Sequence, residues 1–131
     1  MDTNVLVRYT VEDDLQKSKE VKSFFESVSR GEIILYLSSV VLLEMAFVLK
    51  SVYKKDTDLI VKVVRKLAKT RGVVIVDKTN LKLALEYLDK YRVKFSDCLI
   101  VSSIPKGVRV FSYDDDFRKM KLDLIDPRDF S

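Results

Sequence analysis

The chain has 131 residues, 47% of them hydrophobic and 34% charged, and its 24 basic and 20 acidic side chains leave a formal net charge of +4. This profile predicts one helix-rich domain over residues 1–131, and the mild basic balance permits nucleic-acid binding without requiring it. Because the sequence has no histidine and one cysteine, it excludes intrachain disulfides, zinc sites of the common Cys/His type and catalysis by histidine.

No segment is typical of a membrane protein. The longest apolar stretch, residues 33–43, is too short for a transmembrane helix and contains Ser38 and Ser39. The first residues have neither the basic nor the apolar region of a signal peptide. We therefore expect a cytoplasmic protein with no membrane partner.

Apolar residues recur at helical spacing in most of the chain, and polar residues stand where helices would begin. The predicted helices cover, in chain order, about residues 15–29, 39–53, 57–71, 80–91, 97–105 and 115–120. Their expected N-caps are Asp14, Ser38 or Ser39, Asp56 or Asp58, and Asp97. Residues 5–9 form a short apolar segment that the pattern assigns to neither class.

Short apolar runs alternate with these helices and predict strands. They cover residues 33–37, 73–76 and 108–111, with residues 122–125 as a candidate edge strand. The runs are continuous and rich in β-branched residues, which is typical of parallel strands covered on both faces. We predict an α/β fold, a three-layer sandwich with a central, mostly parallel sheet flanked by helices.

Four separated acidic residues each stand beside a predicted strand end or within a predicted helix: Asp2, Glu44, Asp97 and Asp114. Glu44 is the most informative, because it is the only polar residue between Val40 and Leu49. A helix that is apolar on every side should be buried, and a lone buried carboxylate is costly unless something compensates its charge. A metal ion shared with other carboxylates would do so, and such ligands suit Mg²⁺ or Mn²⁺.

Each acidic residue also has a simpler interpretation. Asp2 and Asp97 can be helix caps, and the cluster of residues 114–116 can be a turn followed by a cap. Glu44 lies more than one turn beyond Ser39, so it is no capping partner, but a buried salt bridge to Lys or Arg would also explain it.

Four segments together resemble the motifs of PIN-domain ribonucleases, in particular the short VapC-type toxins. The segments are, in order, residues 2–7, 38–44, 95–100 and 110–117. Each motif alone is weakly specific, but their order and spacing cover nearly the whole chain. In that family the first Asp follows a central strand, and only Met1 precedes Asp2 here. We therefore expect either that this strand is nearly absent or that the true start lies upstream of Met1.

The resemblance implies a set of metal ligands, a second set of residues around them, and partners. The implied ligands of one or two Mg²⁺ or Mn²⁺ ions are Asp2, Glu44, Asp97 and Asp114, with Asp116 as an accessory acid. The residues implied to support these ligands or face the substrate are Asn4, Ser38 and Ser112. The implied reaction is hydrolysis of RNA phosphodiester bonds, leaving 3′-hydroxyl and 5′-phosphate ends. A homodimer and a small VapB-type antitoxin are the implied protein partners.

Three other functions compete with this one. The chain could be a catalytically silent PIN-like module that binds RNA or a protein. A receiver-like signalling domain is disfavoured, because it needs an acceptor Asp at a strand end near mid-chain, where residues 51–69 are predicted helix. A nuclease for structured RNA or DNA flaps is disfavoured because the chain has no added helical arch.

Overall fold

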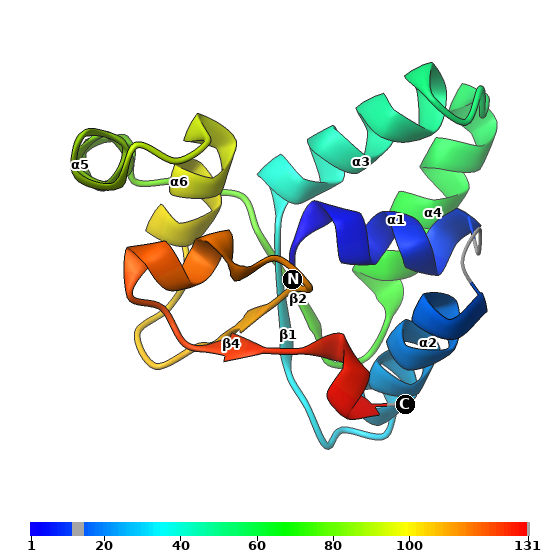
Figure 1. The fold of residues 1–131 in the computed structure, drawn as a ribbon. Helices are drawn as coiled ribbons and strands as arrows, with labels where there is room; N and C mark the ends of the chain where they lie inside the picture. The colour runs from blue at the N-terminus through cyan, green and yellow to red at the C-terminus, as the bar shows by residue number, and fades with distance from the viewer. Residues whose placement is uncertain (12–14, 131) are drawn as a thin grey trace.

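The computed structural model describes residues 1–11 and 15–130 and contains short strands between two groups of helices (Figure 1). The helices are α1 (Thr3–Val11), α2 (Leu15–Ser29), α3 (Ser39–Ser51), α4 (Thr57–Lys69), α5 (Leu81–Tyr91), α6 (Phe95–Ser102) and the 3-10 helices η1 (Asp115–Met120) and η2 (Pro127–Phe130). The strands are β1 (Leu35–Ser38), β2 (Val73–Val76), β3 (Val110–Phe111) and β4 (Leu124–Ile125).

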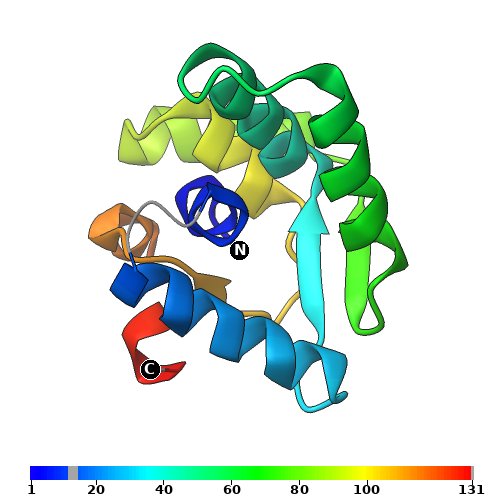
Figure 2. The same ribbon diagram turned by 90° about the vertical axis from the view of Figure 1, so that its right-hand side faces the viewer.

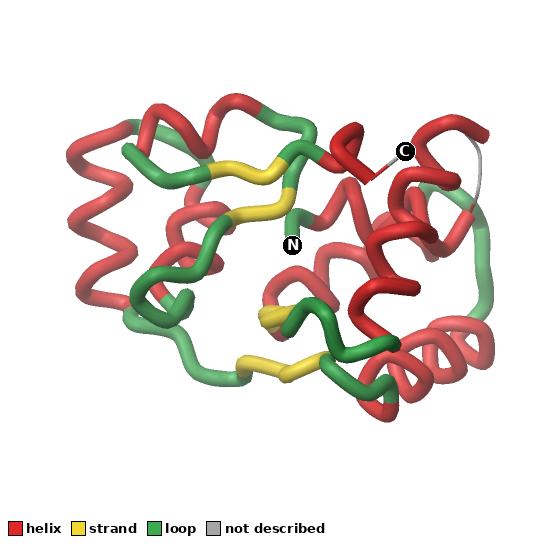
Figure 3. The backbone as a smooth tube through the Cα atoms, turned by 90° about the horizontal axis from the view of Figure 1, so that it is seen from below, coloured by secondary structure: helices red, strands yellow, loops and turns green. Residues whose placement is uncertain are grey.

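The strands form parallel pairs, which confirms the predicted α/β class. β1 pairs with β2, with Leu35 opposite Val73, and β3 pairs with β4, with Val110 opposite Leu124. A parallel pair needs a crossover connection, and helices α3 and α4 provide it between β1 and β2. Helices α1 to α4 lie on one side of the strands, and α5 and α6 lie on the other (Figures 1 and 3).

The strand pairs lie on either side of the beginning of the chain (Figure 3). The backbone N–H of Asp2 donates a 2.9 Å hydrogen bond to the carbonyl oxygen of Phe111, so the residues before α1 run beside β3. A cavity of about 220 Å³ separates the pairs, and Met1, Leu35 and Val110 are among its lining residues. The strands of the described residues are therefore two pairs around this cavity and do not form one continuous sheet.

Three helices begin at polar caps, and the sequence predicted two of them, at Ser38 and Asp56. The hydroxyl of Ser38 accepts from the N–H of Val40 at the start of α3. Asp56 caps α4 and Asn80 caps α5 in the same way, each through a side-chain oxygen that accepts a backbone N–H three residues ahead. Asp14, the predicted cap of α2, lies outside the described residues.

Other boundaries differ from the prediction. Residues 5–9, left unassigned, belong to α1. The prediction that Asp97 begins a helix was wrong, because α6 starts at Phe95 and Asp97 lies within its first turn. Lys94 is the N-cap of α6 but makes no side-chain capping bond, so the local pattern gave no signal there. The strands predicted at residues 108–111 and 122–125 are shorter, with two residues each.

The larger hydrophobic core joins the first helices to β1. Helix α1 packs on both α2 and α3 (Figure 2), and Phe24 of α2 stacks on Phe111 with ring centroids 3.9 Å apart. A smaller cluster lies under α5, α6 and η1; its fully or nearly fully buried members are Ala84, Cys98, Val101, Val110, Phe117 and Met120. In the described part of the chain, no helix has both the length and the apolar character needed to cross a membrane.

Helix α3 is not buried on every side, and the prediction that it would be was wrong. Val41, Met45 and Leu49, spaced four residues apart, face the core and are fully buried. Leu43 and Phe47 lie on the opposite face, and each is 71% exposed. An all-apolar helix has no polar stripe, so its sequence could not indicate which side the rest of the chain covers.

Candidate active site

The four acidic residues singled out by sequence come from four parts of the fold. Asp2 directly precedes α1, Glu44 lies in α3, Asp97 lies in α6, and Asp114 is the N-cap of η1 just after β3. The charges of the other three acidic residues affect the pKa of Asp97. Its pKa is raised from 3.8 to about 6, first by burial and next by the charge of Asp2. Lys94 lowers the pKa of Asp97, and the charges of Glu44 and Asp114 raise it by smaller amounts. The charges of Asp2, Glu44 and Asp114 therefore all act on Asp97.

A buried serine connects Asp2 to Asp114. The hydroxyl of Ser112 donates a 2.8 Å hydrogen bond to Oδ2 of Asp2 and accepts one of 2.9 Å from the backbone N–H of Asp114. Burial raises the pKa of Asp2, and the hydrogen bond from Ser112 opposes that rise. The resemblance predicted Ser112 to stand near the ligands. Its hydroxyl bonds to the side chain of Asp2 and to the backbone of Asp114.

Both carboxylate oxygens of Glu44 have partners. The hydroxyl of Thr3 donates to Oε1 at 2.9 Å, and the ammonium of Lys94 is 2.9 Å from Oε2. The side chain of Glu44 is 21% exposed and that of Lys94 is 67% exposed, so the ion pair lies at the rim of the site. The salt bridge left open as an explanation of Glu44 is therefore present.

Thr3 and Lys94 are site residues that sequence reasoning missed. Thr3 adjoins Asp2, so its position next to a candidate ligand was a usable signal. Lys94 lies three residues before Asp97 and 50 residues from Glu44, and no local pattern marks a contact over that distance.

The remaining predicted residues are less closely connected to the site. Oδ1 of Asp114 accepts the backbone N–H of Asp116 at 2.8 Å, which caps η1. The carboxylate of Asp116 is exposed and pairs with Lys119 at 2.9 Å. Ser38 is buried and caps α3, whereas Asn4 is exposed on α1.

The comparison with known families decides the identity of this fold. The chain matches the PIN domain family over residues 1–122, which include all four acidic positions. The chain belongs to the PIN domain family. Proteins of this family are generally nucleases and typically use divalent metals. A search of curated proteins gave no match.

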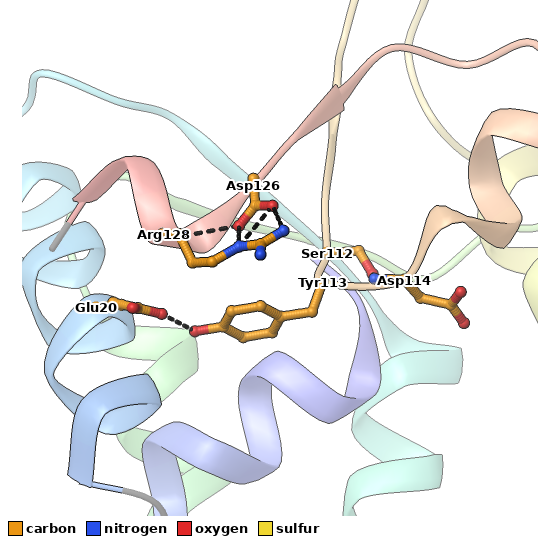
Figure 4. A network of polar contacts seen from close by, with 6 residues as sticks. All are labelled: Glu20, Ser112, Tyr113, Asp114, Asp126 and Arg128. Carbon is orange, nitrogen blue, oxygen red and sulfur yellow. Dashed lines mark hydrogen bonds and ion pairs between the residues drawn. The ribbon is translucent and has the colours of Figure 1, made fainter.

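In this PIN domain, the loop that carries Ser112 and Asp114 is anchored to α2 through Tyr113 (Figure 4). The phenol of Tyr113 donates a 2.5 Å hydrogen bond to Oε2 of the buried Glu20. Gln16 donates to the other oxygen of Glu20 at 3.0 Å. This buried pair fixes the residue between Ser112 and Asp114, and sequence reasoning missed it because Glu20 follows no motif.

A second polar pair follows β4 on the same side of the molecule (Figure 4). The guanidinium of Arg128 binds the carboxylate of Asp126 through two nitrogens, and the backbone N–H of Arg128 also donates to Asp126 at 2.9 Å. Asp126 is therefore held ionised, and its pKa is lowered by these bonds. The pair begins η2, the last element of the described chain.

The PIN domain's donor set fits a divalent metal in its chemistry. Carboxylate oxygens are the ligands that Mg²⁺ and Mn²⁺ prefer. Burial is the largest cause of the raised pKa of both Asp2 and Asp97, and a nearby cation would favour their ionised forms. Within residues 1–11 and 15–130, however, no three acidic or cysteine side chains are arranged closely enough to hold one ion. One of these carboxylates, Glu44, is paired with Lys94 at 2.9 Å.

Proposed function

We propose that this PIN domain is a Mg²⁺- or Mn²⁺-dependent endoribonuclease that hydrolyses phosphodiester bonds in RNA. The metal ligands of this proposal are Asp2, Glu44, Asp97 and Asp114, with Asp116 as an accessory acid. The observation that carries the proposal is the match to the PIN domain family over residues 1–122, which include all four acidic positions. Partial burial and the charges of the other three acids also raise the pKa of Asp97 to about 6. Without histidine in the chain, carboxylates, Lys, Tyr or a metal must carry out such a reaction, and a metal held by carboxylates is the choice that the PIN family favours.

In this proposal a bound Mg²⁺ or Mn²⁺ supplies an acidified water and stabilises negative charge on the phosphate. The protein's own residues orient the ligands. Ser112 fixes Asp2 through a 2.8 Å hydrogen bond, and Thr3 fixes Glu44 through one of 2.9 Å. The Tyr113–Glu20 pair holds the backbone of the loop that carries Asp114. Such support limits the movement of the carboxylates when the substrate binds.

The test is cleavage of a fluorogenic pool of single-stranded RNA by purified protein. We expect cleavage with Mg²⁺ or Mn²⁺, none with EDTA, and products with 3′-hydroxyl and 5′-phosphate ends. Asp97→Asn should abolish cleavage because it removes one carboxylate charge from the site without changing its size. Asp58→Asn is the matched control, since Asp58 is exposed in the first turn of α4.

A second candidate is a catalytically silent PIN-like module that binds RNA or a protein. The ion pair between Glu44 and Lys94 favours it, because that contact already neutralises one candidate ligand. Folded protein that binds RNA equally well with Mn²⁺ and with EDTA, and cleaves none of the pool, would establish this candidate and exclude the nuclease.

We further propose that the protein is the cytoplasmic toxin of a VapBC-type toxin–antitoxin pair, acting as a homodimer that a VapB-type antitoxin inhibits. The exposed apolar side chains of Leu43 and Phe47 on α3 support a protein partner, because exposed apolar clusters mark interaction surfaces. The free, buried thiol of Cys98 suits a reducing compartment. Induced expression in a bacterial host should arrest growth, and Asp97→Asn should not. Normal growth on expression of folded wild-type protein would contradict the toxin role.

A further inference from the structure

The side chain of Lys94 places a positive charge at the acidic site. It lies between α5 and α6, and its backbone carbonyl accepts the N–H of Cys98, so the main chain alone begins α6. Its side chain makes no capping bond and instead extends to α3, where its ammonium is 2.9 Å from Oε2 of Glu44.

The charge of Lys94 also acts beyond Glu44. The pKa of Lys94 is raised first by its hydrogen bond to Glu44, and the charges of Asp97 and Asp2 add to that rise. Lys94 therefore balances part of the negative charge that three candidate ligands share. A divalent cation among the same carboxylates would repel this ammonium and would compete with it for Glu44.

We propose that Lys94 is a displaceable counter-ion: it holds Glu44 in the metal-free protein, releases it when a divalent ion binds, and then contacts a phosphate of the bound RNA. This inference rests on the proposed nuclease function and assigns Lys94 a positioning role toward the metal and a binding role toward the substrate. The side chain is 67% exposed at the rim, so solvent is open to it when the pair breaks. A lysine ammonium on a flexible stem is suited to exchange one anionic partner for another.

If Lys94 exchanges Glu44 for a phosphate in this way, replacing Lys94 should have opposite effects on the binding of Mn²⁺ and on the binding of RNA. In Lys94→Gln, Mn²⁺ should bind about fivefold more tightly, which corresponds to losing a competing ion pair of the partly exposed kind. A single-stranded RNA oligonucleotide, bound with Ca²⁺ in place of Mn²⁺, should bind more weakly. The slope of its log affinity against log salt should fall by about one phosphate contact. If Lys94 had only a structural role, its replacement would weaken the binding of both Mn²⁺ and RNA, or of neither.

The experiment combines calorimetric titration of EDTA-stripped protein with Mn²⁺ and RNA binding over a salt series. Lys82→Gln is the matched control, because Lys82 is an exposed lysine on the neighbouring helix α5 and its loss changes the net charge equally. Lys94→Arg keeps the charge and should restore RNA binding. Unchanged or weaker Mn²⁺ binding by Lys94→Gln overturns the inference while leaving the nuclease proposal standing. Wild-type protein that binds no Mn²⁺ overturns both.

A measurement on the wild-type protein makes the test independent of how the variant folds. Side-chain NMR of the lysine ammonium groups during a Mg²⁺ titration should show the Lys94 resonance shifting as Glu44 is released. The Lys82 resonance should stay in place. A Lys94 resonance that does not move at Mg²⁺ concentrations that saturate the site would contradict displacement.

Discussion

At the scale of single residues, Asp97 makes the site sensitive to pH. Its pKa is about 6 in the folded protein against an ordinary 3.8, because it is buried among other carboxylates. Between these values the folded, metal-free protein retains a proton that the unfolded chain has lost, so its stability decreases as pH rises through this window. A bound cation favours the ionised carboxylate, and binding must therefore weaken as the pH falls below about 6.

We accordingly expect the stabilisation by Mn²⁺ to grow as the pH rises through about 6, and Asp97→Asn to lose most of that dependence. Thermal unfolding with Mn²⁺ and with EDTA, at pH values on both sides of this point, measures it. Asp58→Asn serves as the exposed control and should retain the wild-type dependence. A Mn²⁺ effect that is the same at every pH would contradict the raised pKa.

The residues of the site differ in how well the sequence predicted them. Glu44 could be predicted as a site residue because few arrangements compensate a charged residue in an apolar helix. The sequence left two such arrangements open, a bound metal and a salt bridge. Choosing between them needed the position of Lys94, which is 50 residues away. The pairing of Glu20 with Tyr113 could not be predicted either, because the hydrogen bond joins residues that are 93 positions apart and no local pattern marks it.

At the scale of elements, Gly72 sets the turn that leads from α4 into β2. Its φ of +86° is strained for any side chain, and an added Cβ would lie 2.8 Å from the carbonyl oxygen of Val28. Gly107 has the same φ, but an added Cβ there meets nothing within 4 Å. Gly107→Ala should therefore cost about 1 kcal/mol from backbone strain alone, and Gly72→Ala should cost about 1–3 kcal/mol more from overpacking. Urea unfolding of both variants measures the difference, and equal losses would contradict the close approach.

Helix α3 provides a test of the proposed homodimer. Leu43 and Phe47 are each 71% exposed, so replacing both with Glu should leave the stability of the monomer within about 0.5 kcal/mol of wild type. If this face joins two copies, the double variant should be a monomer by light scattering under conditions in which the wild type is a dimer. A wild-type monomer, or a variant that remains dimeric, would exclude this face as the dimer surface.

Helix starts were the most predictable feature of the elements, and short strands were the least. The caps of α3, α4 and α5 are local hydrogen bonds between a polar side chain and a nearby N–H, and such bonds are encoded in the adjoining residues. Helix α6 begins two residues before the cap-like Asp97, and its N-cap residue, Lys94, makes no side-chain capping bond. The two-residue strands β3 and β4 pair only with each other, so tertiary contacts and not apolar run length set their ends.

At the scale of the whole molecule, the prediction of one domain over residues 1–131 can be tested by unfolding. The larger and smaller hydrophobic clusters could melt separately if they belonged to separate units. We expect a single transition, because α6 contacts α3 and Ser112 bonds directly to Asp2. Far-ultraviolet circular dichroism and tyrosine fluorescence should give the same midpoint, since Tyr9 reports on the larger cluster and Tyr87 on the smaller. Two distinct midpoints would contradict the single domain.

The hydrogen bond between Ser112 and Asp2 joins residues that are 110 positions apart, so the candidate site is closed by a contact between distant parts of the chain. During translation, the ribosome adds Asp2 more than one hundred residues before it adds Ser112 and Asp114. Contacts between distant parts of a chain form only after the intervening loop has closed. For the ribonuclease proposed here, the nascent chain therefore lacks a complete site until Ser112 and Asp114 have been made, and the messenger and ribosome that produce it are spared until then.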